Sequence, residues 1–255
     1  TNVRGNGSVG GPAGPGAPLS AWRPVRGMEL GLEDDSLHDD VLSQLEALQL
    51  TPDRPLIVSD ADEVIFAFVR GLEAYLLDNG HFMDLKSFAM RGNIRDSESG
   101  EPVSADAVKA LINGYFAERT EQIEPVDGAA EALAALSQRA QILVLSNTPL
   151  DCREARRRAL VKHGMDYPLV ANIGRKGGAM AYLAARQTAP MFFLDDIPHN
   201  ISSVARAAGS VTRLHFIADH RLRDMLGAAE DADARIDDWP DAREFIEGRL
   251  AAAGF

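Results

Sequence analysis

Residues 55–66 of the chain read PLIVSDADEVIF, an apolar run that ends in two carboxylates one residue apart. A short run of Leu, Ile and Val without polar alternation is typical of a parallel strand that is covered on both faces. Ligand sites in parallel sheets lie at the carboxyl ends of strands, and Asp60 and Asp62 stand at that end. Two acids in one small volume repel each other unless a cation or a shared proton intervenes. The stretch therefore favours a hard ion such as Mg²⁺, with an acidic turn in solvent as the alternative.

Composition and charge limit the classes of protein to which the chain can belong. Its 255 residues include 38 acidic and 26 basic ones, which gives a formal net charge of -12. Such a charge repels a phosphate backbone over most of the surface, so we expect no nucleic-acid partner. No stretch approaches the apolar length that crosses a membrane, and the single cysteine, Cys152, excludes an internal disulfide. We therefore predict a cytoplasmic protein without a membrane partner.

The distribution of apolar residues predicts an α/β fold. Residues 1–27 are rich in Gly and Pro and poor in apolar residues, which is typical of a disordered tail. Four further apolar runs are separated by helical patterns, at residues 141–145, 169–171, 191–194 and 211–216. This rhythm predicts a doubly wound parallel sheet with helices on both faces, formed by residues 28–66 and 125–255. The acidic stretch at 230–238 is interpreted as a solvated face.

Residues 67–124 separate the first strand from the rest of this core. Two stripes of apolar residues at three- and four-residue spacing predict two helices, one before Asn79-Gly80 and one over 108–116. No strand is evident between them. The segment is longer than an ordinary crossover between parallel strands. We therefore expect a small inserted helical domain with hinges near 66–68 and 124–128.

A hydroxyl follows the run at 141–145. Ser146 comes first, and Thr148 and Pro149 suit the cap and the first position of a helix. A hydroxyl beside the free N–H groups at the positive end of a helix is a natural phosphate cradle. The alternative is that Ser146 acts only as a cap.

Charged side chains mark two more loops. Lys176 lies among glycines that would let the backbone approach a phosphate, or it is an ordinary solvated lysine. Asp195 and Asp196 directly follow the run at 191–194. Their repulsion would be relieved by a metal ion, although a solvated turn would also accommodate them.

Together and in this order, the strand ends resemble those of the haloacid dehalogenase superfamily of phosphohydrolases. The resemblance covers about residues 55–217 and matches four motifs, which are Asp60-Ala61-Asp62, Ser146, Lys176 and Asp195-Asp196. It implies a Rossmann-like core with an inserted helical cap of the C1 type. Two departures are Glu63, where many members have glycine, and the lack of a glycine ahead of Asp195.

The resemblance implies a Mg²⁺-dependent phosphatase that acts on a small phosphorylated metabolite. Asp60 would attack phosphorus to form an aspartyl-phosphate, while Asp62 would protonate the leaving oxygen and later activate water. The Mg²⁺ ligands would be Asp60, the backbone carbonyl of Asp62, and Asp195 or Asp196. The phosphoryl oxygens would be held by Ser146, the Asn147 amide and Lys176.

Other functions on the same fold stay open. A phosphomutase would use the same residues, whereas a dehalogenase would need neither a metal nor the second acid, so Asp62 argues against it. A catalytically silent phospholigand-binding module is disfavoured by the complete set of reacting residues. Candidates for selecting the substrate, or else members of a solvated basic loop, are Arg91, Asn93 and Arg95.

Overall fold

The computed structural model describes residues 35–86, 90 and 92–255. The predicted tail at residues 1–27 and the candidate Arg91 lie outside the described residues. Within them, the chain forms a six-stranded parallel sheet with helices on both faces, which confirms the predicted fold class. No helix in these ranges is long and apolar enough to cross a membrane.

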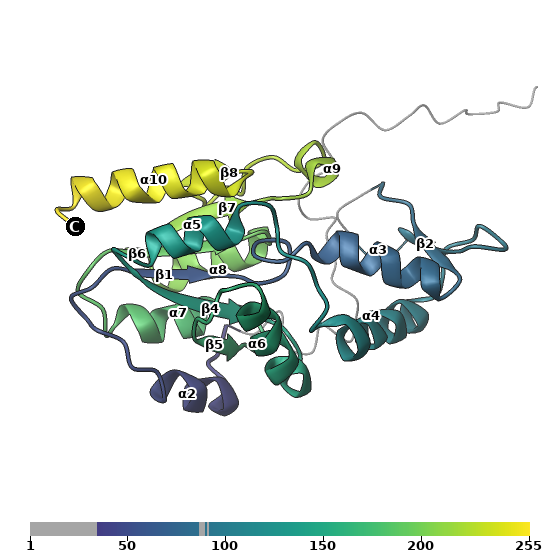
Figure 1. Ribbon diagram of the computed structural model, residues 1–255, viewed down its shortest axis with the longest axis horizontal. Helices are drawn as coiled ribbons and strands as arrows, with labels where there is room; N and C mark the ends of the chain where they lie inside the picture. Colours follow the sequence, from purple (N-terminus) through teal and green to yellow (C-terminus); the bar gives the residue numbers. More distant parts are fainter. Residues whose placement is uncertain (1–34, 87–89, 91) are drawn as a thin grey trace, which may run out of the picture.

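The strands of the main sheet lie in the order β5-β4-β1-β6-β7-β8, and every neighbouring pair is parallel (Figure 1). Their bounds are Leu56–Ser59 (β1), Gln141–Ser146 (β4), Leu169–Ala171 (β5), Met191–Asp195 (β6), Thr212–Phe216 (β7) and Ala234–Ile236 (β8). The chain runs outward from β1 through β4 and β5, and then on the other side through β6, β7 and β8. Such a reversal of strand order opens a crevice at the carboxyl ends of the strands, where ligands bind in α/β sheets.

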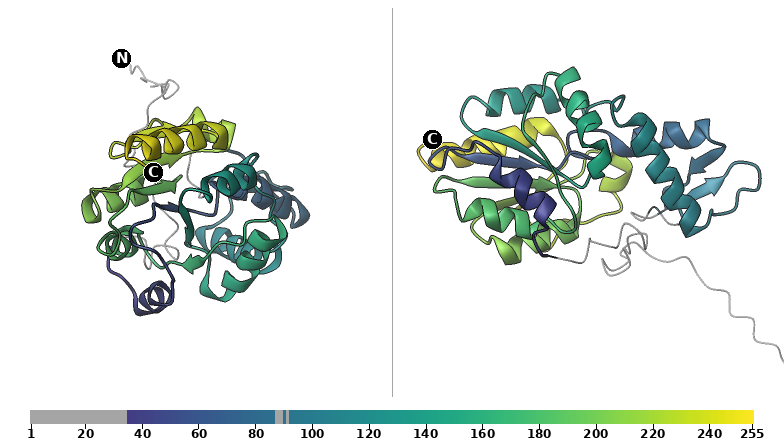
Figure 2. Two further views of the ribbon diagram at one scale, coloured as in Figure 1. Left: turned by 60° about the vertical axis from the view of Figure 1, so that its left-hand side comes forward. Right: turned by 90° about the horizontal axis from the view of Figure 1, so that it is seen from below.

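Alternation along the strands divides the core into two layers. Ile57 faces one side of the sheet and Leu56 and Val58 the other, and all three are fully buried. The helices that cover the Ile57 side are α5 (Ala129–Leu136), α6 (Arg153–Lys162) and α10 (Trp239–Ala252). Those that cover the opposite side are α2 (Asp39–Glu46), α7 (Gly177–Ala184) and α8 (Pro198–Ala207) (Figure 2). Burial on both faces explains why the strands are continuous apolar runs in the sequence.

The segment between β1 and α5 is a mixed α/β insertion rather than the helical one that the sequence predicts. Its elements are α3 (Phe68–Asp78), β2 (His81–Met83), β3 (Ile94–Asp96) and α4 (Ala105–Arg119), and it projects from one end of the sheet (Figure 1). The two strands pair antiparallel over three residues each. A strand of that length is too short to show the period-two pattern by which strands are identified in a sequence.

The two connections between this insertion and the core lie side by side. Phe66 forms an antiparallel bridge with Pro125, and the backbone N–H of Ala67 donates to the Glu124 carbonyl at 3.0 Å. These contacts join the chain that leaves β1 to the chain that returns toward α5. These two adjacent segments, residues 66–67 and 124–125, attach the insertion to the core and are called the paired crossing below.

Helix α9 (His220–Arg223) provides a second contact between the core and the insertion. Arg221 donates from Nη1 and Nη2 to the two carboxylate oxygens of Glu73 on α3, at 2.7 and 2.9 Å. Behind this pair, Val69 of α3 packs with Ile217 and Leu222 in a separate apolar cluster. A bidentate pair beside an apolar contact fixes how α3 lies against the core.

The acidic stretch at 230–238 exposes Glu230, Asp231 and Asp233 to solvent, as the sequence predicts, but it is more than a solvated face. It contains β8, which pairs in parallel with β7 and buries Ile236. Only three residues of the stretch are in the strand, and their acidic neighbours obscure them in the sequence. Asp238 then caps α10, because its side chain accepts a hydrogen bond from the Asp241 backbone N–H at 2.9 Å.

Helices α3 and α4 interlock through two tyrosines and two glycines. A Cβ atom at Gly71 would lie 2.4 Å from the hydroxyl of Tyr115, and one at Gly114 would lie 2.3 Å from that of Tyr75. Each tyrosine hydroxyl thus rests against the backbone of the facing helix. The Tyr115 hydroxyl is buried and makes no hydrogen bond among the described residues. Glycine at these helical positions is required by close approach, not by backbone conformation.

We predict that Gly71→Ala destabilises the protein, although alanine is the better helix former. The added methyl group would overlap the Tyr115 hydroxyl, and overpacking of this kind costs about 1–3 kcal/mol, more than the gain of up to about 1 kcal/mol in helix propensity. Equilibrium unfolding in urea measures the difference. The double variant Gly71→Ala/Tyr115→Phe removes the overlapping oxygen and should recover most of the loss. A single variant at least as stable as the parent would contradict the interlock.

Candidate active site

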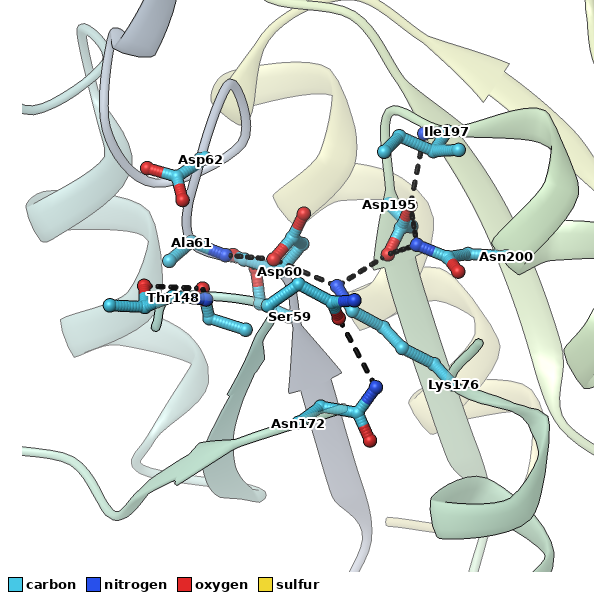
Figure 3. Close-up of polar contacts among 12 residues, drawn as sticks. Ser59, Asp60, Ala61, Asp62, Thr148, Asn172, Lys176, Asp195, Ile197 and Asn200 are labelled. Atoms are coloured by element: carbon cyan, nitrogen blue, oxygen red, sulfur yellow. Dashed lines mark hydrogen bonds and ion pairs between the residues drawn. The ribbon is translucent and has the colours of Figure 1, made fainter. Parts of the chain in front are cut away.

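The strand ends bring the predicted site residues together at the carboxyl edge of the sheet (Figure 3). Asp60 follows β1, Ser146 ends β4 and Asp195 ends β6. These positions are adjacent because β1 pairs with β4 on one side and with β6 on the other. Lys176 reaches the same place from the loop before α7. The four predicted motifs therefore meet at one site.

The ammonium group of Lys176 is buried between two carboxylates. Its Nζ lies 2.8 Å from Asp60 Oδ1 and 2.6 Å from Asp195 Oδ2 (Figure 3), and none of the lysine side chain is exposed. Burial by itself lowers the pKa of an amine, but the charges of Asp195 and Asp60 outweigh it and raise the pKa of Lys176 above its ordinary value. The alternative of a solvated loop lysine is therefore wrong.

Three carboxyl groups converge beside that ammonium. One oxygen from each of Asp60, Asp195 and Asp196 lies within 4.8 Å of the other two, and all three residues are buried. Burial raises the pKa of Asp60 to about 6, with Lys176 opposing and Asp195 adding to the shift. Burial also raises the pKa of Asp196 well above its ordinary value, and the charges of Asp195 and Asp60 add to that shift. The residues fit a hard divalent cation, since they supply only oxygens and one ammonium cannot balance three carboxylates.

The orientation of Asp195 is set by donors of the protein itself. The backbone N–H of Ile197 donates to Oδ1 at 2.9 Å, and Nδ2 of Asn200 lies 3.0 and 3.1 Å from Oδ1 and Oδ2 (Figure 3). Asn200 is buried in the first turn of α8. The sequence analysis missed this residue, although an amide at the start of the helix after paired acids was a usable signal.

Ser146 and Thr148 form a buried pair of hydroxyls after β4. Their oxygens lie 2.8 Å apart, and the backbone N–H of Thr148 donates to Ser146 Oγ at 3.1 Å. The predicted helix cap at Thr148 is wrong, because the chain continues into the 3-10 helix η2 (Leu150–Cys152), which has no side-chain cap. The Thr148 hydroxyl instead accepts a hydrogen bond from Nε of Arg156 at 3.1 Å. The sequence analysis also missed this arginine.

Asn147 connects the loop after β4 to the loop that carries Lys176. Its Nδ2 donates to the carbonyl of Gly174 at 2.8 Å, and its Oδ1 lies 3.1 Å from Nδ2 of Asn172. The side-chain amide is thus engaged with the protein. A phosphate contact by Asn147 therefore falls to its backbone N–H.

Asp62 lies apart from the Lys176 cluster. Its Oδ1 is 2.5 Å from Nη2 of Arg156 on α6, and its side chain is 20% exposed. In Figure 3 its carboxyl group is turned away from Asp60 and Lys176. Burial raises the pKa of Asp62, while the nearby Arg156 guanidinium opposes that shift. The two aspartates of the first motif therefore have different cationic partners.

Glu63 adopts a backbone conformation to which glycine is better suited. Its φ is 61°, in the left-handed region that side chains other than glycine seldom adopt. The buried carboxyl group accepts a hydrogen bond from the Val69 N–H at 2.9 Å, in the first turn of α3. Burial raises the pKa of Glu63 to about 7, with the Val69 N–H opposing. The bond to α3 compensates the backbone strain and ties the Asp60–Asp62 loop to the insertion.

His215 of β7 forms a hydrogen bond with the backbone of the loop that carries Asp195 and Asp196. Its Nδ1 accepts from the Ala229 N–H at 3.1 Å, so its Nε2 carries the hydrogen that points to the carbonyl of Asp196 at 3.0 Å. Burial lowers the pKa of His215 to about 4, although its bond to Asp196 opposes the shift. A neutral imidazole therefore holds the backbone beside the acid pair.

Asn93 and Arg95 make contacts within the insertion. Asn93 is buried, and its Oδ1 accepts from the Lys86 N–H at 3.3 Å. Arg95 donates from Nη1 to the Gly100 carbonyl at 2.8 Å, and its Nε lies 3.1 Å from Asp84. Both residues brace the loops beside β2 and β3, and their selection of substrate stays a prediction.

Comparison with solved structures identifies the fold. The chain superposes with a TM-score of 0.52 on a haloacid dehalogenase-like protein of unknown function from Agrobacterium tumefaciens, at 19% identity over 76% of this chain and 98% of that one. The same TM-score relates it to a HAD-family hydrolase from Deinococcus radiodurans with bound phosphate and sodium, at 14% identity over 78% and 98% of the chains. A predicted phosphoglycolate phosphatase from Haemophilus somnus also scores 0.52, at 14% identity over 78% and 100%.

The chain therefore has the haloacid dehalogenase fold, as the motifs predict. No protein-family model matches the sequence, and no curated protein is similar to it in sequence. At identities of 10–19%, the similarity lies in the course of the backbone.

We predict that acid destabilises the fold through His215. Its pKa of about 4 lies below the ordinary value of 6.5, so between these two pH values the unfolded chain binds a proton that the folded chain excludes. The free energy of unfolding should thus fall as the pH falls through this window, by up to roughly 3 kcal/mol.

The variant His215→Gln isolates this effect, because an amide can still donate and accept but does not titrate. Urea unfolding of both proteins in EDTA, at about pH 7 and about pH 5, measures it. The parent should lose more stability than the variant on acidification. An equal loss in the two proteins would exclude His215 as the cause.

Proposed function

We propose that the protein is a Mg²⁺-dependent phosphatase that hydrolyses a small phosphorylated metabolite through an aspartyl-phosphate on Asp60. The observation that carries this proposal is the buried Lys176 ammonium between Asp60 and Asp195, with Asp62 two residues further along the chain. Such a set supplies a carboxylate nucleophile, a cation for the phosphoryl group and a second carboxyl group for proton transfer.

The contacts of Asp60 favour one of its oxygens as the nucleophile. Oδ1 accepts from the Ala61 N–H at 2.6 Å and lies 2.8 Å from Lys176 Nζ, so we assign the attack on phosphorus to Oδ2. The bond from Oδ2 to phosphorus forms as the bond to the leaving oxygen breaks, and Asp62 gives that oxygen a proton. Water then attacks the phosphorus, its proton passes to Asp62, and inorganic phosphate departs from a regenerated Asp60.

Negative charge at the site has to be balanced before an anionic substrate can bind. Mg²⁺ bound there would shield the carboxylates from the phosphate and polarise a phosphoryl oxygen. Its proposed ligands are Asp60, the backbone carbonyl of Asp62, and Asp195 or Asp196. The groups proposed to bind phosphoryl oxygens are Lys176, the Ser146 hydroxyl and the backbone N–H of Asn147.

Proteins of the same fold support the class of chemistry. The Deinococcus radiodurans hydrolase holds a phosphate ion, and the Haemophilus somnus protein is described as a predicted phosphoglycolate phosphatase. Each is 14% identical to this chain, so the substrate is not carried over from them. We propose a compact substrate, because the insertion lies at the same end of the sheet as the site (Figure 1).

A screen of phosphorylated metabolites, with and without Mg²⁺, tests the proposed function. Release of inorganic phosphate from a phosphomonoester identifies a phosphatase, whereas conversion of one phosphate ester into its isomer identifies a phosphomutase. A dehalogenase would release halide from a haloacid in EDTA and would not need Asp62. Binding of phosphate esters without turnover would indicate a silent binding module.

We predict that activity disappears in EDTA and returns with Mg²⁺. The three converging carboxyl groups supply only oxygens, which suits Mg²⁺ better than a soft metal. The measurement is phosphate release from an aryl phosphate before and after addition of the metal. Full activity in EDTA would contradict a metal site at Asp60, Asp195 and Asp196.

We predict that Asp62→Asn loses turnover far more than substrate binding, because Asp62 is proposed to move protons and not to hold the phosphoryl group. A loss in kcat of about 10²–10⁴-fold with a small change in KM is expected for an alkyl phosphate. An aryl phosphate should be hydrolysed with a smaller defect in its first step, so that the aspartyl-phosphate accumulates and can be detected by mass spectrometry. As a comparison, Asp60→Asn should abolish turnover and form no adduct. Turnover by Asp62→Asn equal to that of the parent on both substrates would refute the assignment.

A further inference from the structure

Arg156 is a buried charge that the steps above do not use. It lies on α6, its side chain is fully buried, and it is among the largest side chains with no exposed surface. Placing a guanidinium out of contact with water costs free energy unless acceptors surround it. The groups that accept hydrogen bonds from Arg156 therefore indicate its role.

Those acceptors belong to two different strand ends. Nη2 lies 2.5 Å from Asp62 Oδ1, after β1, and Nε donates to Thr148 Oγ1 at 3.1 Å, after β4. Thr148 in turn contacts Ser146 Oγ at 2.8 Å. One guanidinium thus connects the proposed proton donor to the hydroxyl proposed to bind the phosphoryl group. Its planar fork fixes both directions at once.

Through Thr148, Arg156 is also connected to the Ser146 hydroxyl. Arginine only donates, so the Thr148 oxygen accepts from Arg156 and its own hydrogen is available to Ser146 Oγ. Ser146 Oγ also accepts from the Thr148 N–H at 3.1 Å. When the Thr148 hydroxyl is the donor of this hydroxyl pair, the Ser146 hydrogen is left for a phosphoryl oxygen.

The burial on the two sides of the ion pair differs. The Arg156 side chain is fully buried, whereas that of Asp62 is 20% exposed. The arginine therefore supports the aspartate from the protein side and leaves part of the carboxyl group accessible. The ring of Phe66 closes the remaining side, with its centroid 5.0 Å from Cζ of Arg156. Nη1 has no hydrogen-bond partner among the described residues. The guanidinium therefore contacts Asp62 through Oδ1 alone.

We propose that Arg156, itself hydrogen-bonded to Thr148, is a positioning residue that fixes the carboxyl group of Asp62 for proton transfer. This inference rests on the proposed phosphatase function. Its physical basis is that a carboxyl group on a loop must be held in one orientation for efficient proton transfer, and here a single rigid fork provides the restraint.

The test compares Arg156→Met with the parent on an alkyl phosphate and on an aryl phosphate. Methionine fills a similar space but cannot hold Asp62. We expect kcat on the alkyl phosphate to fall by about 10²-fold with a small change in KM, and to fall less on the aryl phosphate, whose leaving group needs less protonation. Arg157→Met is the matched control, because Arg157 is the exposed neighbour on the same helix. It should match the parent on both substrates.

A double-variant cycle separates positioning from a purely structural role. If Arg156 acts through Asp62, Arg156→Met should change kcat by no more than about threefold in the Asp62→Asn background. A structural role would lower kcat by the same factor with either substrate and in either background, and that result would overturn the inference. Should Arg156→Met fail to fold by circular dichroism, Arg156→Lys gives the same readouts, since lysine keeps the charge but cannot bridge Asp62 and Thr148 with one plane.

Failure of the inference differs from failure of the proposed function. A parent protein that releases no phosphate from any phosphomonoester with Mg²⁺ present would remove the proposed function. A parent that is active, with Arg156→Met or Arg156→Lys retaining its rate on the alkyl phosphate, would leave the function in place and overturn the role of Arg156.

Discussion

The structure of the site depends on one buried ammonium group. Lys176 must lie between Asp60 and Asp195, because both carboxyl groups are buried and each needs a positive partner. This requirement extends into the fold, since the loop before α7 has to lie tightly against α8. A Cβ atom at Gly177 would be 2.3 Å from Ser203 Oγ, which accepts a hydrogen bond from the Gly177 N–H at 2.9 Å. Glycine at this position lets the lysine enter the sheet edge.

Asp60 and Asp62 lie in one short loop, but their cationic partners come from opposite faces of the sheet. Lys176 comes from the side covered by α7 and holds Asp60, whereas Arg156 comes from the side covered by α6 and holds Asp62. Each carboxyl group can thus have its own electrostatic environment although the residues are only two positions apart. This division suits one acid for attack on phosphorus and the other for proton transfer.

Much of the fold could be predicted from the sequence, because the central strands are buried on both faces and appear as apolar runs. The residues at the strand ends could be predicted because parallel pairing brings those ends together. β2, β3 and β8 could not, since each has three residues that include a polar or charged one, whereas the three residues of β5 are all apolar. Arg156 was also beyond prediction. It is one of three consecutive arginines in α6, and only tertiary packing shows which one is buried.

The paired crossing at Phe66 and Pro125 has a consequence for how such a protein can change. A chain segment whose ends are already held together costs little more conformational entropy when it is lengthened, since the cost of closing a loop grows only with the logarithm of its length. The insertion, which lies between Phe66 and Pro125 in the chain, can therefore be replaced by a larger or smaller module without moving the sheet. The site residues at the strand ends would then stay in place while the insertion that lies over them changed.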